Sequence, residues 1–326
     1  MELNSDPPEV REAGTYEDEL RLVEAMASFD IELRVLSRHV GPRTITYRVM
    51  PGPGVTVAAI TRRALDVGVQ LSTPSCTARE EQGRMFVEVA REDMDIPRLD
   101  TLPPPTDPRD ILVGVDGLGA SVHIRLDNLP HCILAGSSGS GKSTALRVIL
   151  RGVKRDPTRR LIVCDPKGSG DFEEFHRGRN QVHADLRSAN FAIWTAGEIL
   201  MLRTGQKRAS EVSEAAKNFG DGNVLLVVDE VQMITSKSAK DMLNRILAAG
   251  RSMGMNCILA TQQPSAQVLG NEMRANCPTR LVFRVASQSD SRVALGDSGA
   301  ERLLGLGDGL LRYQGQVTRI QVPSIG

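Results

Sequence analysis

The 326-residue chain has few cysteines, and none of them is arranged for a disulfide framework or a zinc site. The count is odd, the spacings are wide, and no CxxC pair occurs among Cys76, Cys132, Cys164, Cys257 and Cys277. No apolar run is long enough to cross a bilayer, and the polar, acidic start of the chain is not a signal peptide. We therefore expect a protein without an integral membrane segment that works in the reducing cytoplasm.

Net charge and aromatic residues are scarce as well. The 40 Lys and Arg residues equal the 40 Asp and Glu residues, so the chain lacks the basic excess usual in nucleic-acid-binding proteins. Aromatic side chains make up 3% of the sequence, whereas proteins that bind single strands usually stack bases on aromatic rings. If a nucleic acid is bound, this composition favours a duplex that is contacted through its backbone.

The patterns that are present divide the chain into four parts. Residues 1–30 are polar and then weakly helical, which predicts an N-terminal extension that is partly disordered. Strand-like alternation around one amphipathic helix predicts a small α+β domain over residues 31–96. Residues 97–110 are rich in proline, so we expect an extended, non-helical linker there. Residues 111–326 then form the main domain.

Short apolar runs alternate with helical stretches throughout the main domain. Buried strands of this length, separated by helices, predict an α/β fold with a mainly parallel sheet. A β-hairpin turning at Asp116 and Gly117 is expected before them. The strand-like runs are HCILAG (131–136), RLIVCD (160–165), NVLLVVDE (223–230), NCILAT (256–261) and TRLVFRV (279–285).

The first of these runs leads into a complete phosphate-binding motif, G-x-x-x-x-G-K-[ST]. Glycines let the backbone wrap a phosphate, with N–H groups and a helix N-terminus facing the anion. A Gly/Ser-rich turn could produce the same letters, but the strand before it and the helical stretch after it favour ATP binding. In this interpretation Lys142 reaches the β- and γ-phosphates and the Ser143 hydroxyl binds Mg²⁺. The expected nucleotide contacts are Gly136, Ser137, Ser138, Gly139, Ser140, Gly141, Lys142, Ser143 and Thr144.

An acidic pair follows the apolar run 224–228. Asp229 is placed to hold the Mg²⁺ coordination shell, and Glu230 to orient or deprotonate the attacking water. Two acids can also cap a helix. Their position directly after a buried strand, in a chain with a phosphate loop, favours catalysis and predicts an ATPase rather than a protein that only binds nucleotide.

The order and spacing of these motifs resemble the motor of the FtsK/SpoIIIE family of DNA translocases, from Ile31 to Gln314. The resemblance implies a RecA-like P-loop core, a hexameric ring with ATP sites between subunits, and double-stranded DNA in the central pore. It is carried by GPRTITYRVMPGPGV, PHCILAGSSGSGKST, LIVCDPKGSG, LLVVDE, AAGRSMGMNCILATQQPS, RANCPTRLVFRVASQSDSR and GAERLLGLGDGLL.

The resemblance also implies roles for polar residues outside the phosphate loop. Gln262, at the tip of a third strand, is the candidate for sensing the γ-phosphate. Arg251, in GRSMG, is the candidate arginine that completes the site of a neighbouring subunit, and Arg280 is the second candidate. Arg274 and Arg292 occupy the positions of pore residues that contact DNA.

Two kinds of departure from the family are visible. Gln263 and Gln288 stand where Arg and Lys are usual, which predicts fewer phosphate contacts and a shallower salt dependence of DNA binding. Membrane helices before the motor and a winged-helix domain after it are both missing. The sequence therefore resembles a soluble, minimal version of the motor.

Three functions fit these observations. The first is an ATP-driven translocase of double-stranded DNA. The second, with the same chemistry and other partners, is a conjugative-transfer or viral genome-packaging ATPase. The third is a type VII-like protein-secretion ATPase, a class that usually carries membrane helices and several motor domains in tandem, unlike this chain.

Overall fold

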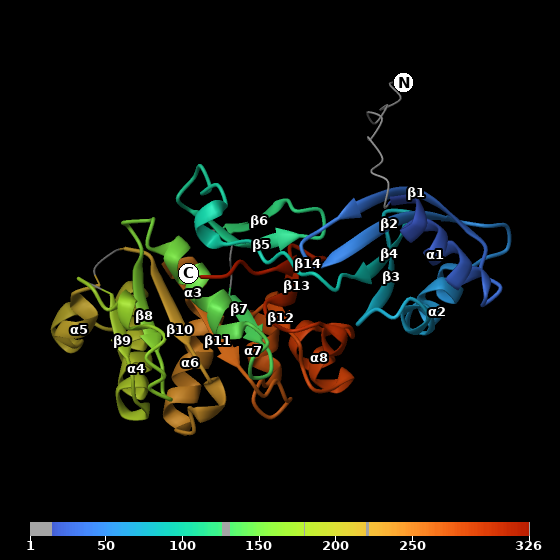
Figure 1. Ribbon diagram of the computed structural model, residues 1–326. Helices are drawn as coiled ribbons and strands as arrows, with labels where there is room; N and C mark the ends of the chain where they lie inside the picture. Colours follow the sequence, from blue (N-terminus) through green and yellow to red (C-terminus); the bar gives the residue numbers. More distant parts are fainter. Residues whose placement is uncertain (1–14, 126–130, 179, 220–221, 326) are drawn as a thin grey trace, which may run out of the picture. The chain divides into compact units, whose positions relative to one another are not determined.

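The computed structural model describes residues 15–125, 131–178, 180–219 and 222–325. Its contacts divide the chain into two compact units. The small unit comprises Met1–Asp95 with Gly117–Gly119, and the large unit comprises Ile96–Asp116 with Ala120–Gly326. Figure 1 colours the chain from blue at the N-terminus to red at the C-terminus. The start of the extension, which was expected to be disordered, lies outside the described residues.

The small unit is an antiparallel sheet with the strand order β1-β2-β4-β3, and it also contains helices α1 and α2. The amphipathic run expected to be helical is α2, whose first turn is capped by the Thr56 hydroxyl, which accepts a hydrogen bond from the Ala59 N–H at 3.2 Å. The elements are α1 (Thr15–Ala27), β1 (Leu33–Val40), β2 (Thr44–Pro51), α2 (Val57–Gln70), β3 (Cys76–Glu81) and β4 (Arg84–Ala90).

Helix α1, which the sequence pattern placed in the N-terminal extension, packs into the core of the small unit. Its Leu22 and Met26 are fully buried in one cluster with Ile60 and Val67 of α2 and Val87 of β4. Because these side chains would otherwise face water, the helix is held by apolar burial rather than by its weak intrinsic preference.

The large unit is built on a sheet of ten strands among the described residues, in the order β6-β5-β14-β13-β12-β7-β11-β10-β8-β9. The six strands from β12 to β9 are parallel, which confirms the predicted α/β fold. The strands are β5 (Asp110–Asp116), β6 (Ser121–Arg125), β7 (His131–Ala135), β8 (Arg160–Cys164), β9 (Gln181–His183), β10 (Val224–Val228), β11 (Met255–Thr261), β12 (Thr279–Phe283), β13 (Asp308–Tyr313) and β14 (Gln316–Gln321).

Both faces of the parallel strands are covered, which explains why these strands are apolar throughout. Alternate residues of a strand point to opposite faces, so Leu226 and Val228 pack into one core with α4 and α6, while Leu225 and Val227 pack into a second core with α3. The helices are α3 (Lys142–Val153), α4 (Leu186–Arg203), α5 (Glu214–Lys217), α6 (Lys237–Ala249), α7 (Asn271–Asn276) and α8 (Gln288–Leu295), all visible in Figure 1.

The proline-rich segment 97–110 had been expected to be extended throughout, but part of it is helical. It contains one turn of 3-10 helix, η1 (Leu99–Thr101), and it pairs with the end of the chain. The Leu99 N–H donates to the Ser324 carbonyl at 2.9 Å, and the Ser324 N–H donates to the Pro97 carbonyl at 2.9 Å. Proline fixes the backbone at its own positions but leaves the intervening residues free to turn.

Helices of the described part are too short or too polar to span a membrane.

Candidate functional site

The phosphate loop joins the end of β7 to the start of α3, and hydrogen bonds from two neighbouring strand ends hold it. The Gly136 N–H donates to the Thr261 carbonyl at the end of β11, at 3.2 Å. The Ser137 N–H donates to the Arg284 carbonyl just beyond β12, at 2.8 Å. All nine predicted nucleotide contacts, residues 136–144, therefore lie in one continuous segment at the carboxyl ends of the parallel strands.

Glycine is required in this loop because its backbone is left-handed and closely packed. Gly139 and Gly141 have φ of 73° and 106°. A Cβ on Gly141 would lie 2.3 Å from the Gly307 nitrogen, and the Gly307 N–H itself donates to the Ser140 carbonyl at 2.8 Å. The segment before β13 therefore packs against the phosphate loop and forms a hydrogen bond with it. The sequence pattern GLGDG did not predict this contact.

Lys142, Asp229 and Glu230 form a buried ionic cluster beside this loop. Their exposed fractions are 4%, 5% and 3%. The Lys142 Nζ lies 2.6 Å from Asp229 Oδ1 and 3.2 Å from Glu230 Oε1. These carboxylate oxygens bind the ammonium that, from the sequence, was expected to bind phosphate oxygens. Burial raises the pKa of Asp229 above its usual value, and the Lys142 ammonium opposes that shift.

A third buried carboxylate, Asp165, lies at the end of β8, the strand next to β10. It accepts hydrogen bonds from the Gly168 N–H at 3.1 Å, from the Ser169 N–H at 2.7 Å and from the Ser169 hydroxyl at 2.9 Å. Its negative charge also contributes to the raised pKa of Asp229. Asp229 and Glu230 together outnumber the one ammonium of Lys142, so the cluster carries an excess of negative charge.

Glu230 is strained and fully engaged in hydrogen bonds. Its φ of 50° and ψ of 57° are left-handed, a conformation uncommon for residues other than glycine. Its Oε2 accepts from Gln232 Nε2 at 2.5 Å and from the Gln262 N–H at 3.2 Å. Thr261 donates its hydroxyl to Gln232 Oε1 at 2.7 Å. Gln262 therefore touches the cluster through its backbone rather than through the side chain singled out from sequence.

Sequence reasoning missed Asp165, Gln232 and Thr261. Asp165 and Thr261 follow the same rule that identified Asp229, since each is a polar residue at or just after the end of a buried strand. Gln232 lies in the 3-10 helix η5 (Val231–Met233) and carries no comparable signal.

Arg251, the first candidate trans-acting arginine, lies at the other end of the parallel strands. Arg251 is exposed in the 3-10 helix η6 (Arg251–Met253) that precedes β11, and its charge acts on His131, the first residue of β7. Strand β7 separates this edge from the phosphate loop by five residues, or about 17 Å. The structure therefore does not bring Arg251 to the phosphate loop of the same chain. Arg280 is level with Ile133 in the middle of β7, and its side chain turns toward carbonyls that precede β12.

Arg280 is half-buried among other arginines. It lies directly opposite Arg312 in the β12–β13 register, and it donates to the carbonyls of Cys277 at 3.3 Å and Arg274 at 3.0 Å. Burial lowers the pKa of Arg280, as do the positive charges of Arg312 and Arg274. Within the described residues, no ion pair is formed by Arg251, Arg274, Arg280 or Arg312.

The two candidate DNA contacts differ in environment. Arg274 is partly buried in α7, and its side chain donates to Asn271 Oδ1. Arg292 is exposed in the last turn of α8. Arg292 is therefore the more accessible of the two.

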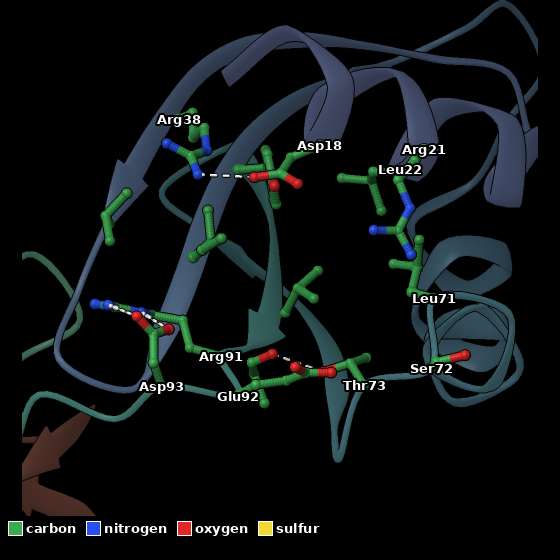
Figure 2. Close-up of a pocket in the computed structure, with 15 residues that line it drawn as sticks. Asp18, Arg21, Leu22, Arg38, Leu71, Ser72, Thr73, Arg91, Glu92 and Asp93 are labelled. Carbon is green, nitrogen blue, oxygen red and sulfur yellow. Dashed lines mark hydrogen bonds and ion pairs between the residues drawn. The ribbon is translucent and has the colours of Figure 1, made fainter. Parts of the chain in front are cut away.

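A separate hollow of about 390 Å³ lies in the small unit. Figure 2 shows two of its arginines turned toward acids of the same hollow: Arg38 bonds Asp18 at 2.9 Å and Arg91 bonds Asp93 at 3.1 Å. Because no motif residue lines the hollow and two of its arginines are already paired with acids, we do not assign the nucleotide chemistry to it.

Known family models match both units. The model of the FtsK alpha domain matches residues 3–90, and a model of the AAA domain matches residues 127–269. Fold and site together define the class of protein, a P-loop ATPase.

Comparison with curated relatives identifies the family within the class of P-loop ATPases. The DNA translocase FtsK of Pseudomonas syringae pv. tomato is 30% identical over 98% of this chain, and FtsK 2 of Ralstonia nicotianae is 29% identical over 98%. The chain belongs to the FtsK family of DNA translocases. It spans 45% and 47% of the length of these two relatives.

Solved structures agree with the fold. The pCW3 conjugation coupling protein TcpA, in its monomer form with ATPγS, superimposes with a TM-score of 0.63 at 18% identity, covering 95% of this chain and 96% of that one. The cytoplasmic domain of the type VII secretion ATPase EccC of Thermomonospora curvata gives a TM-score of 0.56 at 22% identity, covering 68% of this chain and 29% of that one.

Proposed function

We propose that this chain is the motor of an ATP-driven translocase that moves double-stranded DNA. One observation carries the proposal. A strained, buried Glu230 lies beside the phosphate-loop lysine, in a chain that aligns over 98% of its length with DNA translocases. The same proposal includes the division of the chain into a small domain, a linker and a motor domain. It also includes a cytoplasmic location.

The residues of the loop fit ATP and Mg²⁺. The left-handed glycines leave room for phosphate oxygens, and the Lys142 ammonium, now bonded by two carboxylates, would hold those oxygens instead. The described residues include no group of three or more His, Cys, Asp or Glu suited to a metal. Ser143 and Asp229 would therefore hold Mg²⁺ together with phosphate oxygens, as Mg²⁺ sites usually require, and the ion would neutralise phosphate charge.

Glu230 would orient and deprotonate the water that attacks the γ-phosphate. The arginine that stabilises the developing charge would come from a second copy, because Arg251 lies at the opposite edge of the sheet and the Arg280 side chain turns away from the loop. This arrangement needs head-to-tail contacts between copies, and a closed ring, here a hexamer, satisfies them. Arg274 and Arg292 would contact the DNA backbone.

The second candidate is a conjugative-transfer or genome-packaging ATPase, which uses the same residues on DNA from another source. The near-complete coverage of the TcpA structure keeps it as the alternative. Likeness to EccC extends over a smaller share of both chains, so a protein-secretion motor ranks third.

Steady-state ATPase assays with and without linear duplex DNA, at low and moderate salt, test the proposal. We expect duplex DNA to stimulate hydrolysis, salt to weaken that stimulation, and Glu230→Gln to lower the rate by about 10²–10⁴-fold. Glu214→Gln, a change of the same kind at an exposed glutamate paired with Lys217, should retain the wild-type rate. Hydrolysis that is indifferent to DNA, yet lost in Glu230→Gln, would leave an ATPase and refute DNA as the cargo.

A further inference from the structure

A continuous chain of hydrogen bonds runs from Glu230 to the backbone beyond β11. Gln263 donates its N–H to the Thr261 hydroxyl at 3.0 Å. That hydroxyl donates to Gln232 Oε1 at 2.7 Å, and Gln232 Nε2 donates to Glu230 Oε2 at 2.5 Å. All donors point the same way, so each bond polarises the next one.

The orientation of the Gln232 amide follows from its partners. A carboxylate only accepts hydrogen bonds, so the amide nitrogen must face Glu230 and the amide oxygen must face the Thr261 hydroxyl. The opposite orientation would place two oxygens 2.5 Å apart at Glu230. Gln232 therefore connects the catalytic carboxylate to β11 in one way only.

This contact competes with the proposed task of Glu230. A general base must offer a free lone pair to the attacking water. Here Oε2 accepts from Gln232 and from the Gln262 N–H, and Oε1 faces Lys142 at 3.2 Å. In the proposed function Lys142 would turn to phosphate oxygens, so the contacts from Gln232 and from the Gln262 N–H would be the remaining restraints.

The outer end of the chain lies in a segment suited to sensing a polymer. Thr261 is fully buried, whereas the Gln263 side chain is exposed at the start of the segment 262–270. That segment leads directly into α7, which carries Arg274. Because Gln263 is bonded through its backbone, a displacement of the segment acts on Thr261 whatever the side chain at 263.

We propose that Gln232 and Thr261 form a relay that restrains Glu230 until the segment 262–270 moves. Gln232 is then a positioning residue that couples polymer contact to hydrolysis. The proposal rests on the proposed function for the identity of the polymer, but the restraint on Glu230 does not depend on it. Without polymer the relay is closed and hydrolysis is slow. Polymer contact displaces the segment, weakens the relay and releases Glu230.

Two variants open the relay while keeping side-chain shape: Gln232→Met and Thr261→Val. We expect each to raise the ATPase rate without DNA by about three- to ten-fold, the factor that one hydrogen bond of ordinary net strength is worth. Stimulation by duplex DNA should shrink by the same factor. ATP affinity, measured with a fluorescent ATP analogue, should stay within about two-fold, because the relay acts on Glu230 rather than on phosphate binding.

The double variant and a matched control sharpen the test. Gln232→Met combined with Thr261→Val should be no faster than the faster single variant, since both changes break one chain. Gln206→Met makes the same substitution at an exposed glutamine just after α4, outside the segment 262–270, and should retain the wild-type rates. Thermal unfolding confirms that each variant is folded, and Thr261→Val carries the test if Gln232→Met does not fold.

The outcomes separate this inference from the proposed function. Equal losses of rate with and without DNA in both variants would overturn it, because Gln232 would then hold Glu230 in its working position. An unchanged rate without DNA would overturn it as well. If DNA fails to stimulate the wild type while Gln232→Met is still faster, the relay stands and DNA as cargo falls.

Discussion

The two edges of the parallel sheet differ in the sign of their unbalanced charge. At the carboxyl edge, the carboxylates of Asp229 and Glu230 contact the ammonium of Lys142, and the charge of Asp165 acts on Asp229. At the amino edge, arginines gather without a carboxylate partner among the described residues, and they are Arg251, Arg274, Arg280 and Arg312. The first cluster therefore carries an excess of negative charge, and the arginines carry unbalanced positive charge.

This difference indicates how the site becomes complete. Arg280 and Arg312 lie directly opposite each other, an arrangement that costs stability in the isolated chain because like charges repel across a strand pair. An anion from outside the chain would offset that cost. Since Arg251 is separated from the phosphate loop by about 17 Å along β7, we infer that it acts between copies rather than within one copy.

The largest predicted effect concerns the arginines. Arg251→Ala and Arg280→Ala each remove one candidate for the trans-acting arginine. The variant that lacks the arginine acting in trans should hydrolyse ATP about 10³-fold more slowly. Mixing that variant with Lys142→Ala should restore part of the activity, because one interface then combines an intact lysine with an intact arginine from its neighbour.

The matched control for this mixing assay uses two variants of one edge. Lys142→Ala mixed with Glu230→Gln should stay inactive, because every site takes both residues from the same chain. If neither arginine variant regains activity on mixing, the contrast between the two edges has no role in hydrolysis.

The carboxyl edge can be tested through its glycines. Gly141→Ala should weaken ATP binding by about 100-fold, the cost of misplacing a site by roughly 1 Å, because the new Cβ collides with Gly307. Gly315→Ala has a similar left-handed φ of 83° and no atom near the new Cβ, so it should cost only backbone strain. Binding of a fluorescent ATP analogue and thermal unfolding distinguish the two effects, and equal losses in both variants would contradict the role of the Gly307 contact.

The amino edge predicts a pH dependence of stability. Burial lowers the pKa of His131 from 6.5 to about 4, and the nearby Arg251 charge lowers it further. The unfolded chain therefore binds the proton more readily, and stability falls as pH drops from 6.5 toward 4. From that shift we expect a loss of about 2 kcal/mol between pH 7 and pH 5. Denaturant unfolding at the two pH values should show it, and His131→Leu should remove it; an unchanged loss in that variant would point to other groups.

The smallest predicted effect is on DNA binding. Arg292→Gln should reduce the slope of log K against log salt by about 1, because one exposed cation no longer displaces a counterion. Arg98→Gln removes an arginine already paired with Asp100 and should leave the slope as it was. Fluorescence anisotropy of labelled duplex DNA over a range of salt concentrations measures both, and an equal slope for Arg292→Gln and wild type would place the DNA contact elsewhere.

Much of the fold and of the nucleotide site follows from short-range sequence patterns. The five-residue apolar run of β10 predicted a buried parallel strand, since both faces of such a strand must be covered. The segment 136–144 and the acids Asp229 and Glu230 were identified because their chemistry depends on a fixed spacing within a loop or on the end of one strand.

Contacts between distant segments were not predictable in this way. Thr261 and Gln232 are 29 residues apart and meet only because β10 and β11 are neighbours in the sheet. The pairing of Leu99 with Ser324, and the opposition of Arg280 and Arg312, likewise depend on strand order and register. Those are set by the packing of the whole unit rather than by any local pattern.

The sequence by itself therefore determined which segments are buried, where phosphate binds and which acids stand beside it, because those properties depend on residue type and local spacing. Only the tertiary structure decided that Glu230 is held by Gln232, and that Arg251 lies at the edge opposite the phosphate loop. Both facts depend on where separate strands end relative to one another in space.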